Sequence, residues 1–163
     1  MKICSWNINS IRLRETQVLR FLREQCPDVI CFQECKSPVE NIPQKGFHEL
    51  GYNFMAARGQ KGYNGVAIFS KIPISKEFSI DFANLGQARH IAVCLENSFT
   101  IHNFYVPAGG DEPNIEINLK FEQKINFLND MKNWFISNKP KKAILVGDLN
   151  IAPDEDDVWD HKK

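Results

Sequence analysis

Two short apolar runs, far apart in the chain, each end in an acidic residue. The first run covers residues 28–34 and closes at Glu34, and the second covers residues 143–148 and closes at Asp148. Both are short and bounded by polar residues, which is typical of buried strands. Strands of this kind occur in sheets that helices cover, so the two runs favour an α/β fold.

The rest of the chain alternates between helical and strand patterns. Apolar side chains recur at helical spacing over residues 11–25 and 114–136. Asn9 or Ser10 is expected to cap the first helix, and Pro27 follows its end. Further strands are expected at residues 2–8, 52–57, 65–70, 74–80, 91–95 and 99–106. This order predicts an α/β fold with a mixed β-sheet that helices cover on at least one face.

Length and charge limit the classes of function. The 163 residues suit one ordinary domain, and we expect a single domain over 1–163. The 20 basic and 20 acidic side chains cancel, so any contact with a polyanion has to come from a local patch. No apolar stretch is long enough to cross a bilayer, and no signal peptide follows Met1, so no membrane partner is expected.

The cysteines indicate a reducing compartment. The chain has 5 of them, and an odd number without a secretory signal favours free thiols and a cytoplasmic location. Cys31 and Cys35 are conceivable metal ligands. Their spacing matches no common zinc pattern, however, and alternation along a strand favours buried, small apolar side chains.

Carboxylates at the carboxyl ends of buried strands lie where open α/β sheets bind their ligands. Glu34 and Asp148 share this context and therefore suggest one convergent acidic site. Such a site suits Mg²⁺, which prefers oxygen ligands. Each acid taken singly has a plainer interpretation as a solvated residue at the junction of a strand and a loop.

Other polar residues also follow predicted strands. Asn7 and Asn9 follow the first strand, where an amide can orient a carboxylate or donate to a phosphate. Asn150 comes two residues after Asp148, so both side chains point the same way in extended backbone. Tyr105 lies near the end of a middle strand, where its hydroxyl could bind an anion. Turn amides and core-edge tyrosines also occur without such roles.

A basic, glycine-punctuated loop covers residues 58–65. It contains Arg58 and Lys61, and Arg89 precedes a later strand. These cations could contact phosphates without reading a base sequence. A charged, solvated loop would contain the same residues.

Together, the strand-end residues form an ordered series that resembles the amino-terminal part of the exonuclease III family of AP endonucleases, within the endonuclease/exonuclease/phosphatase superfamily. The matching segments are KICSWNINS (2–10), PDVICFQECK (27–36), GYN (51–53), GQKGYNGVAIFSK (59–71), NFYVPAG (103–109) and LVGDLNIAP (145–153). They cover nearly the whole chain, and the bacterial exonuclease III branch has the most similar pattern. The resemblance implies about half, or somewhat more, of a DNase I-like four-layer α/β sandwich.

The resemblance also implies an activity. Members of this family are metal-dependent DNA phosphodiester hydrolases of base-excision repair, which act as AP endonucleases and as 3′-5′ exonucleases. The implied cofactor is Mg²⁺ or Mn²⁺, and the implied partner is duplex DNA with abasic sites or 3′ ends. A monomer is expected. The number of metal ions, and the preference between abasic sites and 3′ ends, stay open.

Carried over residue by residue, the resemblance implies roles for the strand-end residues. Glu34 would be a direct metal ligand, with Asn7 beside it. Tyr105 would contact the scissile phosphate, Asp148 would align or deprotonate the attacking water, and Asn150 would orient the phosphate or that water. The expected substrate-binding residues are Arg89, Asn103, Lys61 and Asn64.

One departure from the family pattern is expected to matter. The family continues with an Asp/Asn pair and a closing Ser-Asp-His motif, whereas His161 of this chain has no Ser-Asp before it. We therefore expect the chain as written to be inactive or weak alone, with a missing carboxyl-terminal segment supplied elsewhere. The alternatives are a non-catalytic fragment that binds a partner, and a superfamily phosphatase.

Overall fold

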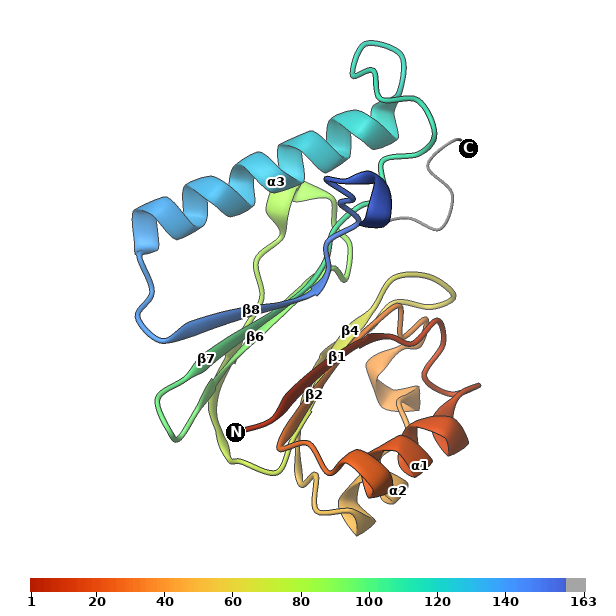
Figure 1. The fold of residues 1–163 in the computed structure, drawn as a ribbon, viewed down its shortest axis with the longest axis vertical. Coiled ribbons are helices and arrows are strands. Elements are labelled where there is room, and N and C mark those ends of the chain that lie inside the picture. Colours follow the sequence, from red (N-terminus) through yellow and green to blue (C-terminus); the bar gives the residue numbers. More distant parts are fainter. Residues whose placement is uncertain (158–163) are drawn as a thin grey trace.

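Two four-stranded sheets lie face to face between layers of helices (Figure 1). The computed structural model describes residues 1–157, so the predictions about His161 fall outside the described residues. Helices α1 (Glu15–Gln25) and α2 (Lys45–Glu49) cover one outer face, and α3 (Leu119–Asn138) covers the other. The order of layers is helix, sheet, sheet, helix. The predicted α/β sandwich is therefore confirmed.

The first sheet has the strand order β1-β2-β4-β3. Its strands are β1 (Ile3–Asn7), β2 (Val29–Gln33), β3 (Phe54–Arg58) and β4 (Val66–Ser70). Strands β1 and β2 are parallel, and the other pairs are antiparallel. Because β2 has a strand on each side and a layer on each face, all of its residues are buried. This position explains the nearly unbroken apolar run that precedes Glu34.

The second sheet has the order β5-β6-β7-β8. Its strands are β5 (Ile74–Phe78), β6 (His90–Leu95), β7 (Thr100–Tyr105) and β8 (Ala143–Asp148). Here β7 and β8 are the parallel pair. The residue pattern alone predicted one mixed sheet, because apolar runs do not say which strands pair. The family resemblance implied only part of a two-sheet sandwich, with an inner sheet face left exposed; both sheets are observed instead, and their inner faces pack against each other.

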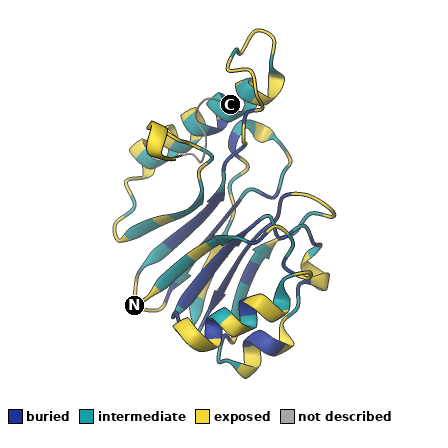
Figure 2. Ribbon diagram, turned by 45° about the vertical axis from the view of Figure 1, so that its right-hand side comes forward, coloured by how far each residue is buried: buried dark blue, intermediate teal, exposed yellow. Residues whose placement is uncertain are grey.

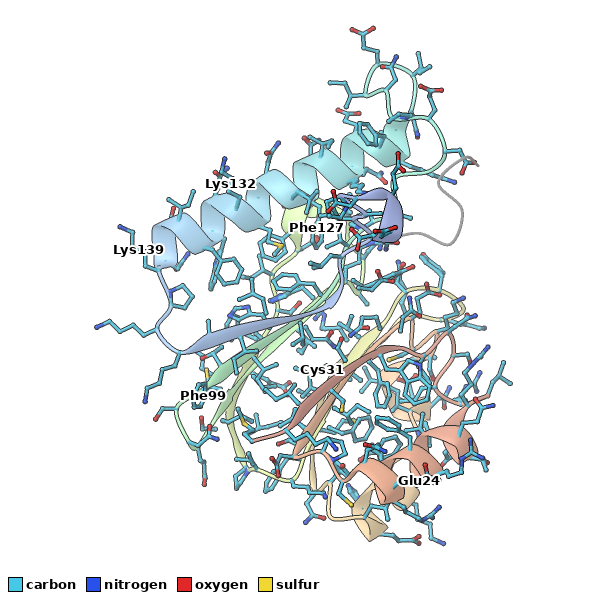
Figure 3. All side chains as sticks on the ribbon, in the orientation of Figure 1. Glu24, Cys31, Phe99, Phe127, Lys132 and Lys139 are labelled. Atoms are coloured by element: carbon cyan, nitrogen blue, oxygen red, sulfur yellow. The ribbon has the colours of Figure 1, made fainter. Side chains whose placement is uncertain are left out.

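Alternate residues of the central strands fill the space between the two sheets. Cys31 of β2 and Ile68 of β4 meet Val93 of β6 and Ile101 of β7, and all four are fully buried. Figure 3 shows Cys31 at this interface between the layers. Cys35 is also buried, so both cysteines behave as the small apolar side chains that were predicted. All the cysteines lie within residues 1–157 and are free thiols.

The remaining apolar side chains fill the two sheet–helix layers. Val18 and Leu22 of α1 pack on the first sheet. Phe127 points from α3 toward the second sheet, where it meets Phe104 (Figure 3). The outward faces of the helices are exposed and the strands between them are largely buried (Figure 2). No helix within residues 1–157 has the length and apolar character needed to span a membrane.

The first long helix begins later than predicted. Asn9 and Ser10 do not cap it, because both have positive φ angles, of 45° and 85°, and lie in the turn before it. The Ser10 N–H donates instead to the Glu34 carbonyl at 2.7 Å. Helix α1 starts at Glu15 without a side-chain cap. Asn9 and Ser10 are therefore polar because they form the turn beside the Glu34 loop, and not because they cap the helix.

The second long helix also begins late. Asn118 is its N-cap, and its side chain accepts hydrogen bonds from the N–H groups of Lys120 and Phe121. Ile117 was expected on the apolar helical face, but it precedes the cap and is 74% exposed. The short elements α2, η1 (Val39–Asn41), η2 (Phe82–Asn84) and η3 (Glu155–Asp157) were not predicted, because they are too brief to show a periodic pattern.

Candidate active site

The carboxyl ends of the two parallel strand pairs meet at one rim of the sandwich. Asn7 ends β1, and Glu34 directly follows β2 in the first sheet. Tyr105 and Asp148 are paired at the ends of β7 and β8 in the second sheet. The structure therefore brings together four residues that are far apart in the sequence.

Asn7 joins the two acidic residues across the sheets. Its Nδ2 donates to Glu34 Oε1 at 3.0 Å and to Asp148 Oδ2 at 2.7 Å. Its Oδ1 accepts from the Asn9 N–H at 3.2 Å, which fixes the orientation of the amide. One nitrogen thus holds carboxylates from two sheets side by side, and the amide oxygen faces its own turn.

Glu34 receives donors on both carboxylate oxygens. Tyr105 donates its hydroxyl to Oε1 at 2.8 Å, and Lys36 Nζ lies 2.9 Å from Oε2. Partial burial alone would raise the pKa of Glu34, but the hydrogen bonds from Asn7, Lys36 and Tyr105 outweigh it. The net effect lowers the pKa, so the carboxylate is ionised at neutral pH.

The backbone around Glu34 is held in an uncommon conformation. Glu34 has a φ of 53° and Lys36 a φ of 50°, in the left-handed region that side chains rarely adopt. Besides the bond from Ser10, the N–H of Cys35 donates to the Gly65 carbonyl at 3.0 Å, and that of Lys36 to the Asn64 carbonyl at 2.8 Å. Such conformations persist where the surroundings over-determine them, often at functional sites.

Tyr105 is sandwiched between Glu34 and a cation. The Arg89 guanidinium lies 4.8 Å from the centre of the Tyr105 ring, and its Nη1 donates to the Tyr105 carbonyl at 3.2 Å. Burial, followed by the neighbouring Glu34, raises the pKa of Tyr105 to about 12. Burial lowers the pKa of Arg89, but an arginine remains charged. Tyr105 is therefore a protonated hydrogen-bond donor beside a fixed positive charge.

The turn after β8 fixes Asp148. Asp148 Oδ1 accepts from the Asn150 N–H at 3.1 Å, and Asn150 Nδ2 donates to the Val106 carbonyl at 2.8 Å. The amide nitrogen of Asn150 therefore secures the loop. Gly147 has a φ of 141°, and a Cβ there would lie 2.0 Å from the Phe104 carbonyl oxygen. Only glycine permits this close approach of β8 to β7.

Asn103 lies inside the sandwich and is fully buried. Its Nδ2 donates to the carbonyls of Phe32 at 2.9 Å and Ala67 at 3.1 Å, and its Oδ1 accepts from Gln33 Nε2 at 2.7 Å. This burial contradicts the prediction that Asn103 contacts the substrate. Its side chain instead links the two sheets beneath the rim.

Asn64 and Lys61 lie on the loop between β3 and β4. Asn64 is only 5% exposed, and its Nδ2 donates to Gln60 at 2.9 Å and to Gln87 at 3.3 Å. The Asn64 side chain thus supports the loop from inside, which corrects the prediction of a direct substrate contact. Lys61 is exposed, and no hydrogen bond or ion pair within residues 1–157 joins it to the Glu34 centre.

Two members of the site were not predicted. Lys36 forms the ion pair with Glu34, and Gln33 forms the buried bridge to Asn103. Lys36 had a visible signal, since a cation two residues after a strand-end acid can fold back onto it. Gln33 had none, because a polar residue in an apolar strand does not reveal the partner that it faces.

The donors at the rim fit a hard divalent cation. Glu34 and Asp148 offer carboxylate oxygens as metal ligands. Glu34 Oε2 already forms an ion pair with the Lys36 ammonium, so a cation can reach this oxygen. Within residues 1–157 no group of three or more His, Cys, Asp or Glu side chains could hold a metal. Mg²⁺ is typically bound by one or two carboxylates with water and substrate oxygens, which matches this donor set.

Known structures share this architecture. An AP endonuclease from Archaeoglobus fulgidus superposes with a TM-score of 0.84 and 31% sequence identity, over 94% of this chain and 59% of that protein. A 3′ phosphatase from Neisseria, bound to a product DNA hairpin, superposes with a TM-score of 0.85 and 29% identity, over 98% and 62%. These similarities extend the match from motifs to the whole described fold.

Sequence comparison gives the same result. Exodeoxyribonuclease III of Haemophilus influenzae is 33% identical over 166 residues, which cover 97% of this chain and 60% of that protein. This chain thus spans about three fifths of the length of the curated bacterial relatives that it matches. The sequence pattern of one family matches residues 4–163. The chain therefore belongs to the Endonuclease/Exonuclease/phosphatase family.

Proposed function

We propose that this chain carries the carboxylate centre of a metal-dependent DNA phosphodiester hydrolase of base-excision repair. The observation that carries the proposal is Asn7, which holds Glu34 and Asp148 together across two sheets beside the Tyr105 hydroxyl. The similarity to an exodeoxyribonuclease III and to an AP endonuclease supports DNA as the substrate.

Glu34 would hold Mg²⁺ or Mn²⁺, with Asn7 fixing the carboxylate. When bound, the cation would supply polarisation of the phosphate and compensation for charge on the leaving oxygen. The orientation of the Asn7 amide makes it a positioning group, because its nitrogen faces the carboxylates. Oxygen donors alone are available from these residues, which favours hard cations over zinc.

The other side chains have distinct tasks in this proposal. Asp148 would align the attacking water and accept its proton, since its carboxylate is held by Asn7 and by the Asn150 N–H. Tyr105 would turn its hydroxyl proton from Glu34 to a phosphate oxygen when DNA binds, and its raised pKa keeps the hydroxyl protonated. Arg89 and the exposed Lys61 would contact DNA phosphates without reading the base sequence.

A second candidate function is removal of a 3′ phosphate from DNA. The Neisseria protein that superposes on this chain is a 3′ phosphatase bound to product DNA, and the two share 29% sequence identity. The same centre could hydrolyse a terminal phosphate, because the bond that breaks is again a phosphorus–oxygen bond. The free thiols support a cytoplasmic setting for either activity.

The test is hydrolysis by the purified 163-residue chain with Mg²⁺ or with EDTA. The substrates are a duplex with an abasic site, a duplex with a recessed 3′ end, and a duplex with a 3′ phosphate. We expect slow, Mg²⁺-dependent hydrolysis of at least one, below the rate of a full-length relative. Glu34→Gln should lower it by about 10²- to 10³-fold, whereas Lys132→Met on the exposed face of α3 should not (Figure 3).

The alternatives give different results. Faster turnover of a phosphoinositide than of any DNA would assign the chain to a phosphatase class. No Mg²⁺-dependent hydrolysis, together with Mg²⁺ binding that Glu34→Gln leaves unchanged, would overturn the proposal. That outcome would favour a non-catalytic fragment that binds a partner.

A further inference from the structure

Lys36 is the cation nearest to the proposed metal ligand. Its Nζ lies 2.9 Å from Glu34 Oε2 and donates to Asn9 Oδ1 at 2.6 Å. The Glu34 side chain is 20% exposed and the Lys36 side chain 32% exposed. By contrast, the pair Arg20–Glu24 on α1 is separated by 3.9 Å and is largely exposed. The Lys36 pair is therefore short and belongs to the rim.

The two oxygens of Glu34 have different surroundings. Oε1 already accepts from Asn7 and Tyr105. Oε2 is engaged by Lys36. A divalent cation that binds Glu34 through Oε2 therefore competes with an ammonium group for the same oxygen. Two cations in contact with the same oxygen would repel each other, so the Lys36 ammonium and the metal ion cannot both stay on Oε2 without a cost in free energy.

Lys36 combines a fixed backbone with a side chain that can move. Its backbone is fixed by the bond to the Asn64 carbonyl and by the left-handed conformation. Its side chain is long, flexible and partly exposed, so the ammonium can leave Glu34 while the backbone stays in place. In the absence of a metal, this positive charge also offsets the two carboxylates that Asn7 holds close together.

We infer that Lys36 is an internal counter-ion that occupies Glu34 Oε2 until a divalent cation displaces it, and that it thereby sets the affinity of the site for that cation. The inference rests on the proposed function, because it requires the metal to bind at Glu34. Lys36 thus acts through Glu34 as a positioning residue, and it changes the affinity for the metal ion and not a catalytic step directly.

The test is a Mn²⁺ titration of the 163-residue chain, in which free Mn²⁺ is followed by electron paramagnetic resonance. Lys36→Met should bind Mn²⁺ about tenfold more tightly than the wild type, because one repelling unit charge is gone. Lys36→Arg should bind like the wild type, because the charge is kept. Lys132→Met removes the same charge from the exposed face of α3 and should also bind like the wild type.

Thermal melting supplies a second readout that also shows whether each variant folds. Without metal, Lys36→Met should melt at a lower temperature than the wild type, because the carboxylates lose their counter-ion. Saturating Mn²⁺ should raise its melting temperature by more than that of the wild type, as linkage requires of the tighter binder. Equal or weaker Mn²⁺ binding by a folded Lys36→Met variant would overturn the inference.

Glu34→Gln separates this inference from the proposed function. If it abolishes Mn²⁺ binding while Lys36→Met leaves the affinity unchanged, the metal site stands and the role of Lys36 falls. If neither the wild type nor Lys36→Met binds Mn²⁺, or if Glu34→Gln leaves binding intact, the proposed metal site is wrong and the inference falls with it.

Discussion

Two residues of strand β7 belong to polar clusters with opposite electrostatic behaviour. Tyr105 faces the rim, where it donates to the ionised Glu34. His102, on the other face of β7, lies under α3 and stacks with His90 of β6. Burial lowers the pKa of His102 to about 4, and burial followed by the charge of His102 lowers that of His90 to about 3. One cluster preserves charge and the other suppresses it.

The hydrogen bonds of the histidine pair determine its tautomers. The Ile80 N–H donates to His90 Nδ1 at 3.0 Å, so the proton of His90 is on Nε2. That group lies 3.2 Å from His102 Nδ1, which must accept, so His102 carries its proton on Nε2. Within residues 1–157, His102 Nε2 is a buried group without a hydrogen-bond partner. A second proton on either ring would break one of these bonds.

The surroundings explain the contrast between the clusters. The rings of Phe78, Trp134 and Phe135 lie 5.6, 5.4 and 5.0 Å from the His102 ring. Aromatic rings offer an N–H group a weak contact, but they do not replace water around a charge. At the rim, hydrogen bonds from Asn7, Tyr105 and Lys36 replace water around Glu34. A buried or half-buried side chain in these two clusters therefore stays charged only where several hydrogen-bond donors surround it, as they do at Glu34.

The largest expected effect breaks the rim cluster. Asp148→Asn should reduce DNA hydrolysis by about 10²- to 10³-fold, because an amide cannot accept the proton of the attacking water. Stability should change by no more than about 1 kcal/mol, since an amide oxygen can still accept from Asn7. Single-turnover hydrolysis and urea unfolding measure the two quantities. The control is Asp111→Asn, a loss of the same charge at an exposed position.

A rate for Asp148→Asn within a few-fold of the wild type would contradict the assigned role. So would an equal loss of rate in Asp111→Asn, because the effect would then report net charge and not the position of Asp148.

The rim was predictable from sequence because one rule placed its residues. Parallel strands end at a common edge, so Glu34 and Asp148, which each closed an apolar run, were expected to converge. The register of β7 with β8 then brought Tyr105 opposite Asp148. Alternation in a strand says that neighbours face opposite sides, but not which layer covers each side. Asn103 was carried over from the family resemblance as a substrate-binding residue, and its own sequence context does not reveal that it faces the first sheet.

The buried pair was not predictable for the same reason. His90 and His102 come from two strands whose pairing the apolar pattern does not reveal, and the register sets His102 opposite Ala92, two residues from His90. Their environment also depends on Trp134 and Phe135 of α3, more than 30 positions away in the sequence. Such contacts arise from layer packing, which local periodicity does not specify.

The effect of intermediate size is a loss of stability at low pH, which the buried histidine pair should cause. The folded-state pKa values of His90 and His102 lie below the ordinary 6.5, so the unfolded chain binds protons that the folded chain rejects. Stability should therefore fall as pH falls from about 6.5 toward about 3. The loss should be on the order of 2 kcal/mol for each histidine by about pH 4.5.

Urea unfolding at pH 7 and about pH 4.5 measures this loss. A variant with both His90→Val and His102→Val should lose less stability between the two pH values, whatever its stability at pH 7. Carboxylates elsewhere contribute equally to both proteins, so the difference between the two losses isolates the pair. Equal losses in the two proteins would show that these histidines do not resist protonation.

The smallest expected effect concerns the Tyr105 hydroxyl, which strand β7 contributes to the rim cluster. Tyr105→Phe removes one donor to Glu34 and should reduce stability at neutral pH by about 1 kcal/mol. The pKa of Glu34 should rise toward its ordinary value, because burial then opposes ionisation with fewer donors against it. Nuclear magnetic resonance titration of the Glu34 carboxyl carbon reports this shift, and Tyr63→Phe, at an exposed tyrosine, is the control.

The pH dependence gives the sign of this last effect. A lowered pKa of Glu34 stabilises the fold above the pKa of the unfolded chain, and this contribution disappears as pH falls through the folded-state value. The wild type and Tyr105→Phe should therefore differ most at neutral pH and converge in acid, where Glu34 is protonated in both. A constant difference at all pH values would mean that the hydroxyl contributes to packing alone, and that Asn7 and Lys36 suffice to keep Glu34 ionised.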